Sequence, residues 1–558
     1  KQILARKEFD ELTQTLFLDE IGTEQINLHY LLKDPSAYGI TGAEYLYAPV
    51  TLEFLEENRE DRMELTSRLE TIETSLLTND QKITMRVLQS FLRTESLSDG
   101  LELYYQPLAT TIGVQAQLPI LLSEYAFYRK QDINDYLKLL DGIDEHYQQI
   151  MEFEKQKAEA GLMMNDTSID HVIESCESYL LKPGDNFMIE TFNSRLEEVP
   201  GLTEEEKEAY RQQNSELLDT AFLTAYKTMI EELKGLKGTG INEQGLCGYP
   251  DGKKYYRYLV YSLTGTSYAS IPDLLKAIES QLLDSLTETS ELLKNHPELA
   301  KQCESYHYRQ TEPEAIMEEL KTLTQSDFPL LPACNYTFKA VPAALELSLS
   351  PAFYLVSPLD DPRNNVIYIN HNPRFSDNQL YNVIAHEGYP GHLYQNVYFH
   401  TSCESDLRKL ISYQGYSEGW ATYVEQLSYT LDNGLGPELG RLLAANASAS
   451  LGLHACLDIY VNYMGWDKEK VKTYLENFYS DPDSVADDIF YAMVENPGNY
   501  LSYYVGYLEF LNMRKTAEAQ LGNRFDAKEF HTFLLDMGNA PFDVIQSYFT
   551  SWLMKQKT

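Results

Sequence analysis

The spacing of apolar residues constrains this chain more than any other feature of its sequence. Across residues 43–95, apolar side chains recur every three or four positions, with charged residues between them. Residues 131–160, 203–235 and 272–295 repeat the pattern. Such spacing gathers apolar side chains on one face of a helix, which is stable only when that face is buried against a neighbour. The sequence therefore predicts a mainly α protein.

Segments that favour β-strands are scarce. The β-branched run at 365–370 is the clearest one, and residues 343–356 can supply a partner strand, so we expect a single small β-sheet. The segment 235–254 contains six glycines, a composition typical of a boundary or a long loop. We expect an N-terminal helical region at 1–235 and a second region at 236–558, packed together as one body.

The charge of the chain excludes some partners. Acidic residues number 85 and basic residues 45, so the net charge is 45 − 85 = −40. This charge repels phosphate backbones and anionic membrane surfaces, and we expect no nucleic-acid partner. No run of 18 apolar residues occurs, so we expect no transmembrane segment. The sequence starts at Lys1 without a methionine, which agrees with the loss of an upstream targeting segment.

The strongest chemical signal is the pair His386-Glu387, followed by His392. Zinc peptidases commonly carry two histidines four residues apart on one helix, with a glutamate beside the first. Here the spacing is six, which on a regular helix separates the histidines by about 120° and about 9 Å along the axis. Residues 388–391 read Gly-Tyr-Pro-Gly, and glycine and proline allow a break there. We expect the helix to break and to return His392 toward His386; otherwise the two are ordinary histidines beside a kink.

A second segment, at 415–425, supplies carboxylates. Glu418 and Glu425 are seven residues apart, two helical turns, and so share one helix face. Two histidines and a glutamate form a common catalytic zinc site that leaves a fourth position open for water. We expect Glu418 to be the third ligand and Glu425 to orient a histidine. The alternative is a helix whose two glutamates face solvent.

Three sequence blocks resemble one known family. They are His-Glu-Gly-Tyr-Pro-Gly-His at 386–392 with Gln395, Glu-Gly-Trp-Ala at 418–421 with Tyr423 and Glu425, and Pro-Gly at 497–498 with Tyr503 and Gly506. Together they are similar to the motifs of the bacterial family catalogued as domain of unknown function 885, with specific matches over about residues 340–545. The resemblance implies a large helical, zincin-like metallopeptidase with its small β-sheet near the active site. It also implies an extracellular or cell-surface location, with a lipid anchor possible upstream of this chain.

From the motifs and the resemblance we expect zinc-dependent hydrolysis of peptide bonds, in short peptides, by the region 236–558. His386, His392 and Glu418 would bind Zn²⁺, and Glu387 would be the general base. Tyr503 occupies the matched position in the Pro-Gly block and would stabilise the oxyanion; its alternative role, in a chain with 42 tyrosines, is packing. Two rival functions are an amidase acting on non-peptide amides and a non-catalytic, metal-containing surface binding protein.

The expected peptide substrate has two further candidate contacts. The strand at 365–370, which includes Tyr368, could be an edge strand that pairs with an extended substrate, or a purely structural strand. His531 lies on an apolar helix face and is either a substrate contact or a buried core histidine. His400 follows the motif but lacks a carboxylate at ligand spacing. If the cleft shares the acidity of the chain, its wall would favour amino-terminal or cationic ends of peptides.

Overall fold

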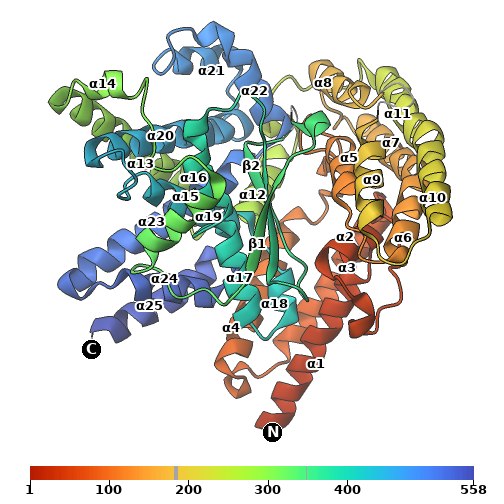
Figure 1. Cartoon of the computed structure of the whole chain (residues 1–558), viewed down its shortest axis with the longest axis horizontal. Coiled ribbons are helices and arrows are strands. Elements are labelled where there is room, and N and C mark those ends of the chain that lie inside the picture. Colours follow the sequence, from red (N-terminus) through yellow and green to blue (C-terminus); the bar gives the residue numbers. More distant parts are fainter. Residues whose placement is uncertain (181–185, 347–348, 558) are drawn as a thin grey trace.

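Helices dominate the protein, as the periodicity predicts (Figure 1). The computed structural model describes residues 1–180, 186–346 and 349–557. The first part of the chain forms α1 (Gln2–Ile21), α2 (Gln25–Leu31), α3 (Leu52–Glu70), α4 (Asn79–Glu95), α5 (Val114–Glu124), α6 (Lys130–Asp141), α7 (Ile143–Glu159), α8 (Asp166–Glu177), α9 (Phe187–Glu198), α10 (Glu204–Leu217) and α11 (Leu223–Leu236).

The second part begins after a loop that contains most of the predicted glycine-rich segment. It comprises α12 (Gly252–Thr264), α13 (Ile271–Asn295), α14 (Leu299–Gln302), α15 (Pro313–Thr324), α16 (Asp377–Glu387), α17 (His392–Ser402), α18 (Asp406–Leu410), α19 (Gln414–Ser428), α20 (Pro437–Asn462), α21 (Lys468–Leu475), α22 (Ala486–Glu495), α23 (Asn499–Leu521), α24 (Ala527–Met537) and α25 (Phe542–Lys557).

The helical segments predicted from periodicity are confirmed. Residues 131–160 form α6 and α7, and residues 203–235 form α10 and α11, joined by a short π-helical turn. The segment 272–295 is α13, with Pro272 in its first turn, where the absent N–H has no intrahelical partner to lose.

One small mixed sheet lies at the centre of the molecule (Figure 1). Its strands are β1 (Asn335–Ala340), β2 (Ala352–Leu355) and β3 (Asn364–Ile369), in the spatial order β1-β3-β2. β1 runs parallel to β3 and β2 runs antiparallel to it. The prediction of strands at 365–370 and within 343–356 is confirmed. The prediction that 365–370 is an edge strand is wrong, because β1 occupies its second side.

The apolar core falls into distinct groups. One joins α12, α13, α15–α17 and α19–α25 with the sheet, and another joins α5–α11 with Val341 and Leu345. A third, built on α1, α2 and α4, includes Leu359 after β2 and Leu407 of α18. The N-terminal helices are thus packed against segments that surround the sheet. A boundary at 235/236 stays a prediction.

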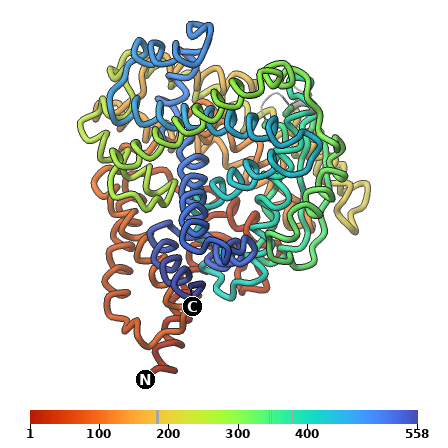
Figure 2. The backbone as a smooth tube through the Cα atoms, turned by 90° about the vertical axis from the view of Figure 1, so that its left-hand side faces the viewer, coloured from red at the N-terminus to blue at the C-terminus, as the bar shows by residue number. Residues whose placement is uncertain are grey.

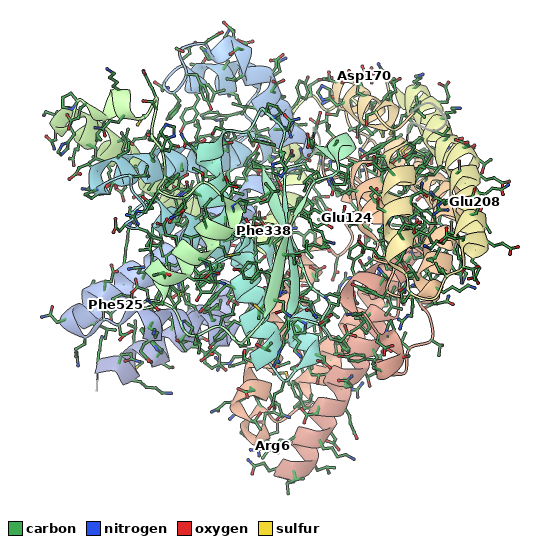
Figure 3. All side chains as sticks on the ribbon, in the orientation of Figure 1. Arg6, Glu124, Asp170, Glu208, Phe338 and Phe525 are labelled. Carbon is green, nitrogen blue, oxygen red and sulfur yellow. The ribbon has the colours of Figure 1, made fainter. Side chains whose placement is uncertain are left out.

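Chain segments far apart in sequence meet around the sheet. Figure 1 shows α5–α11 on one side of the sheet and α13–α16, α20 and α23 on the other. In Figure 2 the two termini lie toward the same end, where α25 packs on α4. Figure 3 places Glu124, at the end of α5, between the sheet and the N-terminal helices, where burial and then the charge of Glu124 raise the pKa of Tyr368 on β3. The sheet therefore separates the two groups of helices.

One helix among the described residues, α20, is long and apolar enough to cross a membrane by length and composition. Of its most apolar window, 56% is buried inside the protein. It packs against α13, α22 and α23. Burial on this scale is typical of a central core helix as well.

Candidate metal centre

A break between two helices brings the motif histidines together. α16 ends with His386-Glu387, and α17 begins at His392. Between them Gly388 and Gly391 depart from helical geometry, and the two imidazole ring centroids lie 4.8 Å apart. The predicted break, and the return of His392 to His386, are confirmed.

The return depends on close contact between backbones. A methyl group added at Gly391 would lie 1.8 Å from the carbonyl oxygen of His386, so only glycine fits. The turn is also anchored from α19, because the buried indole of Trp420 donates a hydrogen bond of 2.9 Å to the carbonyl of Pro390. The Trp of the Glu-Gly-Trp-Ala block thus anchors the turn between the two histidines.

α19 carries both predicted glutamates toward the histidines. Oε2 of Glu418 lies 3.3 Å from Nε2 of His386 and 3.3 Å from Nε2 of His392. Oε2 of Glu425 lies 2.9 Å from Nδ1 of His386. Both carboxylates therefore face the imidazole pair, and the alternative in which they face solvent is excluded.

The approach of α19 to α23 positions the last motif block. A methyl group at Gly419 would lie 2.4 Å from the main chain of Gly506, and one at Gly506 would lie 1.7 Å from the carbonyl oxygen of Gly415. The small residues that allow the helices to touch are these glycines. The contact places Tyr503 of α23 beside the histidines, with its ring centroid 6.5 Å from that of His386.

These side chains form a group able to bind a metal ion. Potential ligand atoms of His386, Glu387 and His392 all lie within 4.8 Å of one another. An oxygen of Glu418 lies within the same distance, at 3.3 Å from one nitrogen of each imidazole. Oε2 of Glu387 also has a protein partner, because it accepts a hydrogen bond of 2.8 Å from the N–H of Tyr354 on β2. Two carboxylates therefore flank the histidine pair from different elements.

Burial shapes the charges of the centre. It raises the pKa of the Glu387 carboxyl above its usual range, and the two histidines partly offset the rise. Burial opposes ionisation of Glu418 as well, but the charge of His392 and the closeness of both imidazoles outweigh it and lower the pKa. Burial, and then the charge of Glu418, raise the pKa of Tyr503, so its hydroxyl keeps its proton.

The group opens into a cleft of about 820 Å³. One wall is residues 350–357, which include all of β2, and another is α17. Tyr503, Lys409 and His400 also line it. The edge strand beside the histidines is therefore β2, a segment that the sequence predicted only as a partner of β3.

Two predicted substrate contacts lie outside this cleft. Tyr368 is not among the lining residues; its ring stacks at 4.8 Å on that of Phe353, which does line the cleft. His531 is fully buried, bonded through Nε2 to the hydroxyl of Tyr423 at 2.8 Å and through Nδ1 to the carbonyl of Asp327 at 2.6 Å. Burial lowers the pKa of His531 to about 3 and keeps it neutral. It is the core histidine of the alternative interpretation, and the prediction of a substrate contact is wrong.

Sequence analysis also missed residues of the cleft. Lys409 and His400 reach it from α18 and from the far end of α17. α18 has only five residues, and its single lysine resembles any surface lysine in the sequence. The eight-residue spacing from His392 to His400 was a usable signal, because it places both on the same side of a helix.

Solved structures with the same fold are known. One, described as a "putative lipoprotein" from Colwellia psychrerythraea, is 18% identical over 99% of each chain, with a TM-score of 0.86. Another, described as a "putative lipoprotein of unknown function" from Shewanella oneidensis, is 15% identical over 96% of this chain and 99% of that chain, with a TM-score of 0.62.

No protein with a curated description matches the chain. A sequence-family model, however, matches residues 36–548, which extends well beyond the three motif blocks to most of the N-terminal helices. By this match, the chain belongs to the family described as bacterial protein of unknown function (DUF885).

Proposed function

We propose that the protein is a zinc-dependent metallopeptidase that hydrolyses peptide bonds in short peptides. The observation that carries the proposal is the convergence of three ligand atoms, Nε2 of His386, Nε2 of His392 and Oε2 of Glu418, beside a second carboxylate at the bottom of a cleft. The family and the two putative lipoproteins have no stated activity, so the proposal rests on the site.

The distances fit zinc. Two ligands about 2.1 Å from a tetrahedral zinc ion lie about 3.4 Å from each other. Both histidine nitrogens are 3.3 Å from the Glu418 oxygen, whereas a charge-assisted hydrogen bond is about 2.7–2.9 Å long. Imidazole and carboxylate are also donors that zinc accepts. We therefore assign His386, His392 and Glu418 as the ligands.

Zinc at this position would act as a Lewis acid, which brings the pKa of water toward about 7 and polarises a substrate carbonyl. Glu387 would take a proton from the attacking water and give it to the leaving amine. The N–H of Tyr354 holds Oε2 of Glu387 and so fixes the orientation of that carboxyl group. Glu425 accepts the Nδ1 proton of His386, which leaves Nε2 as the nitrogen that faces the metal.

The substrate would lie along β2. One side of this strand pairs with β3 and its residues line the cleft, so an extended peptide can pair with the other side. Tyr503 would donate its hydroxyl proton to the developing oxyanion, since it lines the same cleft on the side of α23. Amide hydrolysis of a non-peptide substrate would use the same groups. A binding protein would have no use for Glu387 beside its metal.

Metal content and peptide cleavage test the proposal. We expect one zinc per native chain and cleavage of members of a short-peptide library. Glu387→Gln should keep the zinc and lose at least about 10²-fold in kcat. Glu60→Gln, which removes the same charge from an exposed position on α3, should match the native protein. A native protein that binds no zinc contradicts the assignment, and one that binds zinc without cleaving any library peptide favours the binding protein.

We also propose that the protein works in the cell envelope. The support is that the structural neighbours from Colwellia psychrerythraea and Shewanella oneidensis are each described as "putative lipoprotein". Fractionation of cells that express the full-length gene product, with palmitate labelling, tests this. Recovery in the cytoplasm without label would contradict it.

A further inference from the structure

The cleft has a second polar group at some distance from the histidine pair. One face of α17 lines the cleft from end to end through His392, Gln395, Asn396, Phe399 and His400. The eight residues from His392 to His400 correspond to a rise of about 12 Å. The metal-binding group therefore stands at one end of this helix face and His400 at the other.

Positive charge gathers at the His400 end. Among the described residues that line the cleft, Lys409 is the only lysine or arginine, whereas the three glutamates of the lining, at 387, 418 and 425, all belong to the metal centre. The Lys409 ammonium group donates one hydrogen bond, of 3.1 Å, to the carboxylate of Asp406. An ammonium group has three N–H donors, so two remain for a ligand in the cleft. The cleft is thus acidic at one end and basic at the other.

Arg408 adds charge behind Lys409. Its side chain is 4% exposed, and it donates to the carbonyl oxygens of Met537 and Asn539 rather than to a carboxylate. Within the described part of the chain, no carboxylate lies within ion-pair distance of this guanidinium. Asp80 is near enough to interact electrostatically with Arg408, so the two basic groups, Lys409 and Arg408, have Asp406 and Asp80 as their acidic neighbours. Asn539, one of the carbonyl partners, lines the cleft.

His400 is a polar residue beside the same space. Its side chain is 9% exposed, it lines the cleft, and Nδ1 has no hydrogen-bond partner. Burial, and then the charge of Lys409, lower the pKa of His400 to about 4, so the ring is neutral at pH 7. His400 is therefore an uncharged polar neighbour of the Lys409 ammonium group.

We propose that Lys409 and His400, with Arg408 behind them, form a carboxylate-binding subsite that anchors the C-terminal carboxylate of a peptide. This inference rests on the proposed peptidase function and adds its substrate class. An extended peptide advances about 3.3 Å per residue, so about 12 Å corresponds to three or four residues. The cleaved bond would therefore lie three or four residues before the C-terminus.

Acetyl-capped alanine peptides of four to eight residues, as free acids and as C-terminal amides, test the subsite. Binding is measured by calorimetry on Glu387→Gln, and the cleaved bond is located by mass spectrometry with the native protein. A hydrogen bond to a charged group makes us expect the acid to be preferred by about 10- to 100-fold in Kd and in kcat/KM. The cleavage point should keep its distance from the C-terminus as the peptide grows at its N-terminus.

Two lysine variants complete the design. Lys409→Met should reduce the preference for the acid to within about twofold. Lys138→Met should not change it, because Lys138 also pairs with an aspartate three residues earlier but is exposed on α6. The inference is overturned if acid and amide bind equally, or if the preference survives Lys409→Met. The comparison of acid with amide on native protein needs no substitution, so a misfolded variant does not obscure the result.

A third peptide separates the two sources of a carboxylate. If an amidated peptide that ends in glutamate binds as well as the free acid, the subsite binds a side-chain carboxylate. The carboxylate-binding subsite is then supported, but its assignment to the C-terminal carboxylate is wrong. Binding also separates this inference from the proposed function. If the protein binds the acid more tightly through Lys409 but cleaves nothing, the subsite is supported and the peptidase function is contradicted. If it cleaves acid and amide equally, the peptidase function is supported and the subsite is contradicted.

Discussion

Replacing Gly391 by alanine tests how the chain brings its two histidines together. The added methyl group would lie 1.8 Å from the carbonyl oxygen of His386 and 2.4 Å from that of Ala385, whereas such contacts are essentially never shorter than 3.0 Å. The first contact must therefore lengthen by at least 3.0 − 1.8 = 1.2 Å. Both obstacles are main-chain atoms of α16, and His392 directly follows the substituted residue. The shift falls on the distance between the two ligands.

A zinc site tolerates about 0.2 Å of error in its ligand distances. A displacement of about 1 Å should therefore remove one histidine from the centre. Loss of a group that only orients a ligand weakens metal binding by about 10- to 100-fold, and loss of a ligand should weaken zinc binding by more than that. The rest of the fold should survive, because overpacking costs about 1–3 kcal/mol. Zinc affinity is measured by competition with a chelator, and helix content by circular dichroism.

Gly235→Ala is the matched control. It adds the same methyl group near the end of α11, where nothing lies within 4 Å, and should leave zinc affinity unchanged. The reasoning is refuted if Gly391→Ala binds zinc as tightly as the native protein, since the backbone contact would then not determine where His392 lies. Loss of helix content in Gly391→Ala alone would show that the turn also supports folding.

Three further substitutions have expected outcomes. Glu425→Gln keeps the hydrogen bond to His386 but removes its charge, so zinc affinity should fall about 10- to 100-fold with little change in melting temperature; an unchanged affinity would contradict the orienting role. Tyr503→Phe should lower kcat by about 10²- to 10³-fold at native zinc content, and a native kcat would reduce the residue to packing. Burial raises the pKa of Asp458 from 3.8 to about 7, so stability that is complete below pH 3.8 is lost as the pH rises through about 7. Between pH 5.5 and 8 the free energy of unfolding should fall by about 2 kcal/mol in the native protein and should not fall in Asp458→Asn, as measured by calorimetric melting. An equal decline in both proteins would exclude Asp458 as its source.

The sequence predicted most of what depends on local spacing. Helix α13 follows from its apolar period and from Pro272 in its first turn. The break at 388–391 follows from the residues within it, and the orientation of Glu418 and Glu425 from their two-turn separation. In each case the determining atoms are close together along the chain, so the period or the backbone preference of a few residues is enough.

Features that depend on distant partners were not predictable. β3 is central because β1 joins its second side. β1, with the sequence Asn-Tyr-Thr-Phe-Lys-Ala, does alternate polar and apolar residues, but that pattern indicates a strand and not the strand it pairs with. His531 is a core residue because Tyr423 and Asp327, 108 and 204 residues away, satisfy its two nitrogens. Neither pairing leaves a periodic pattern in the sequence.

The total charge of −40 illustrates the same limit for recognition. It suggested an acidic cleft that favours amino-terminal or cationic ends. At physiological ionic strength, charges are screened beyond about 8 Å, so a ligand in the cleft responds to its immediate neighbours. At the end near His400 those neighbours are Lys409 in the cleft lining, paired with Asp406, and Arg408 behind it, near Asp80. The glutamates of the lining face the histidine pair about 12 Å away. The acidity of the chain therefore does not oppose a carboxylate there. It repels a carboxylate from the metal end, and so favours binding of a peptide with its C-terminus toward Lys409.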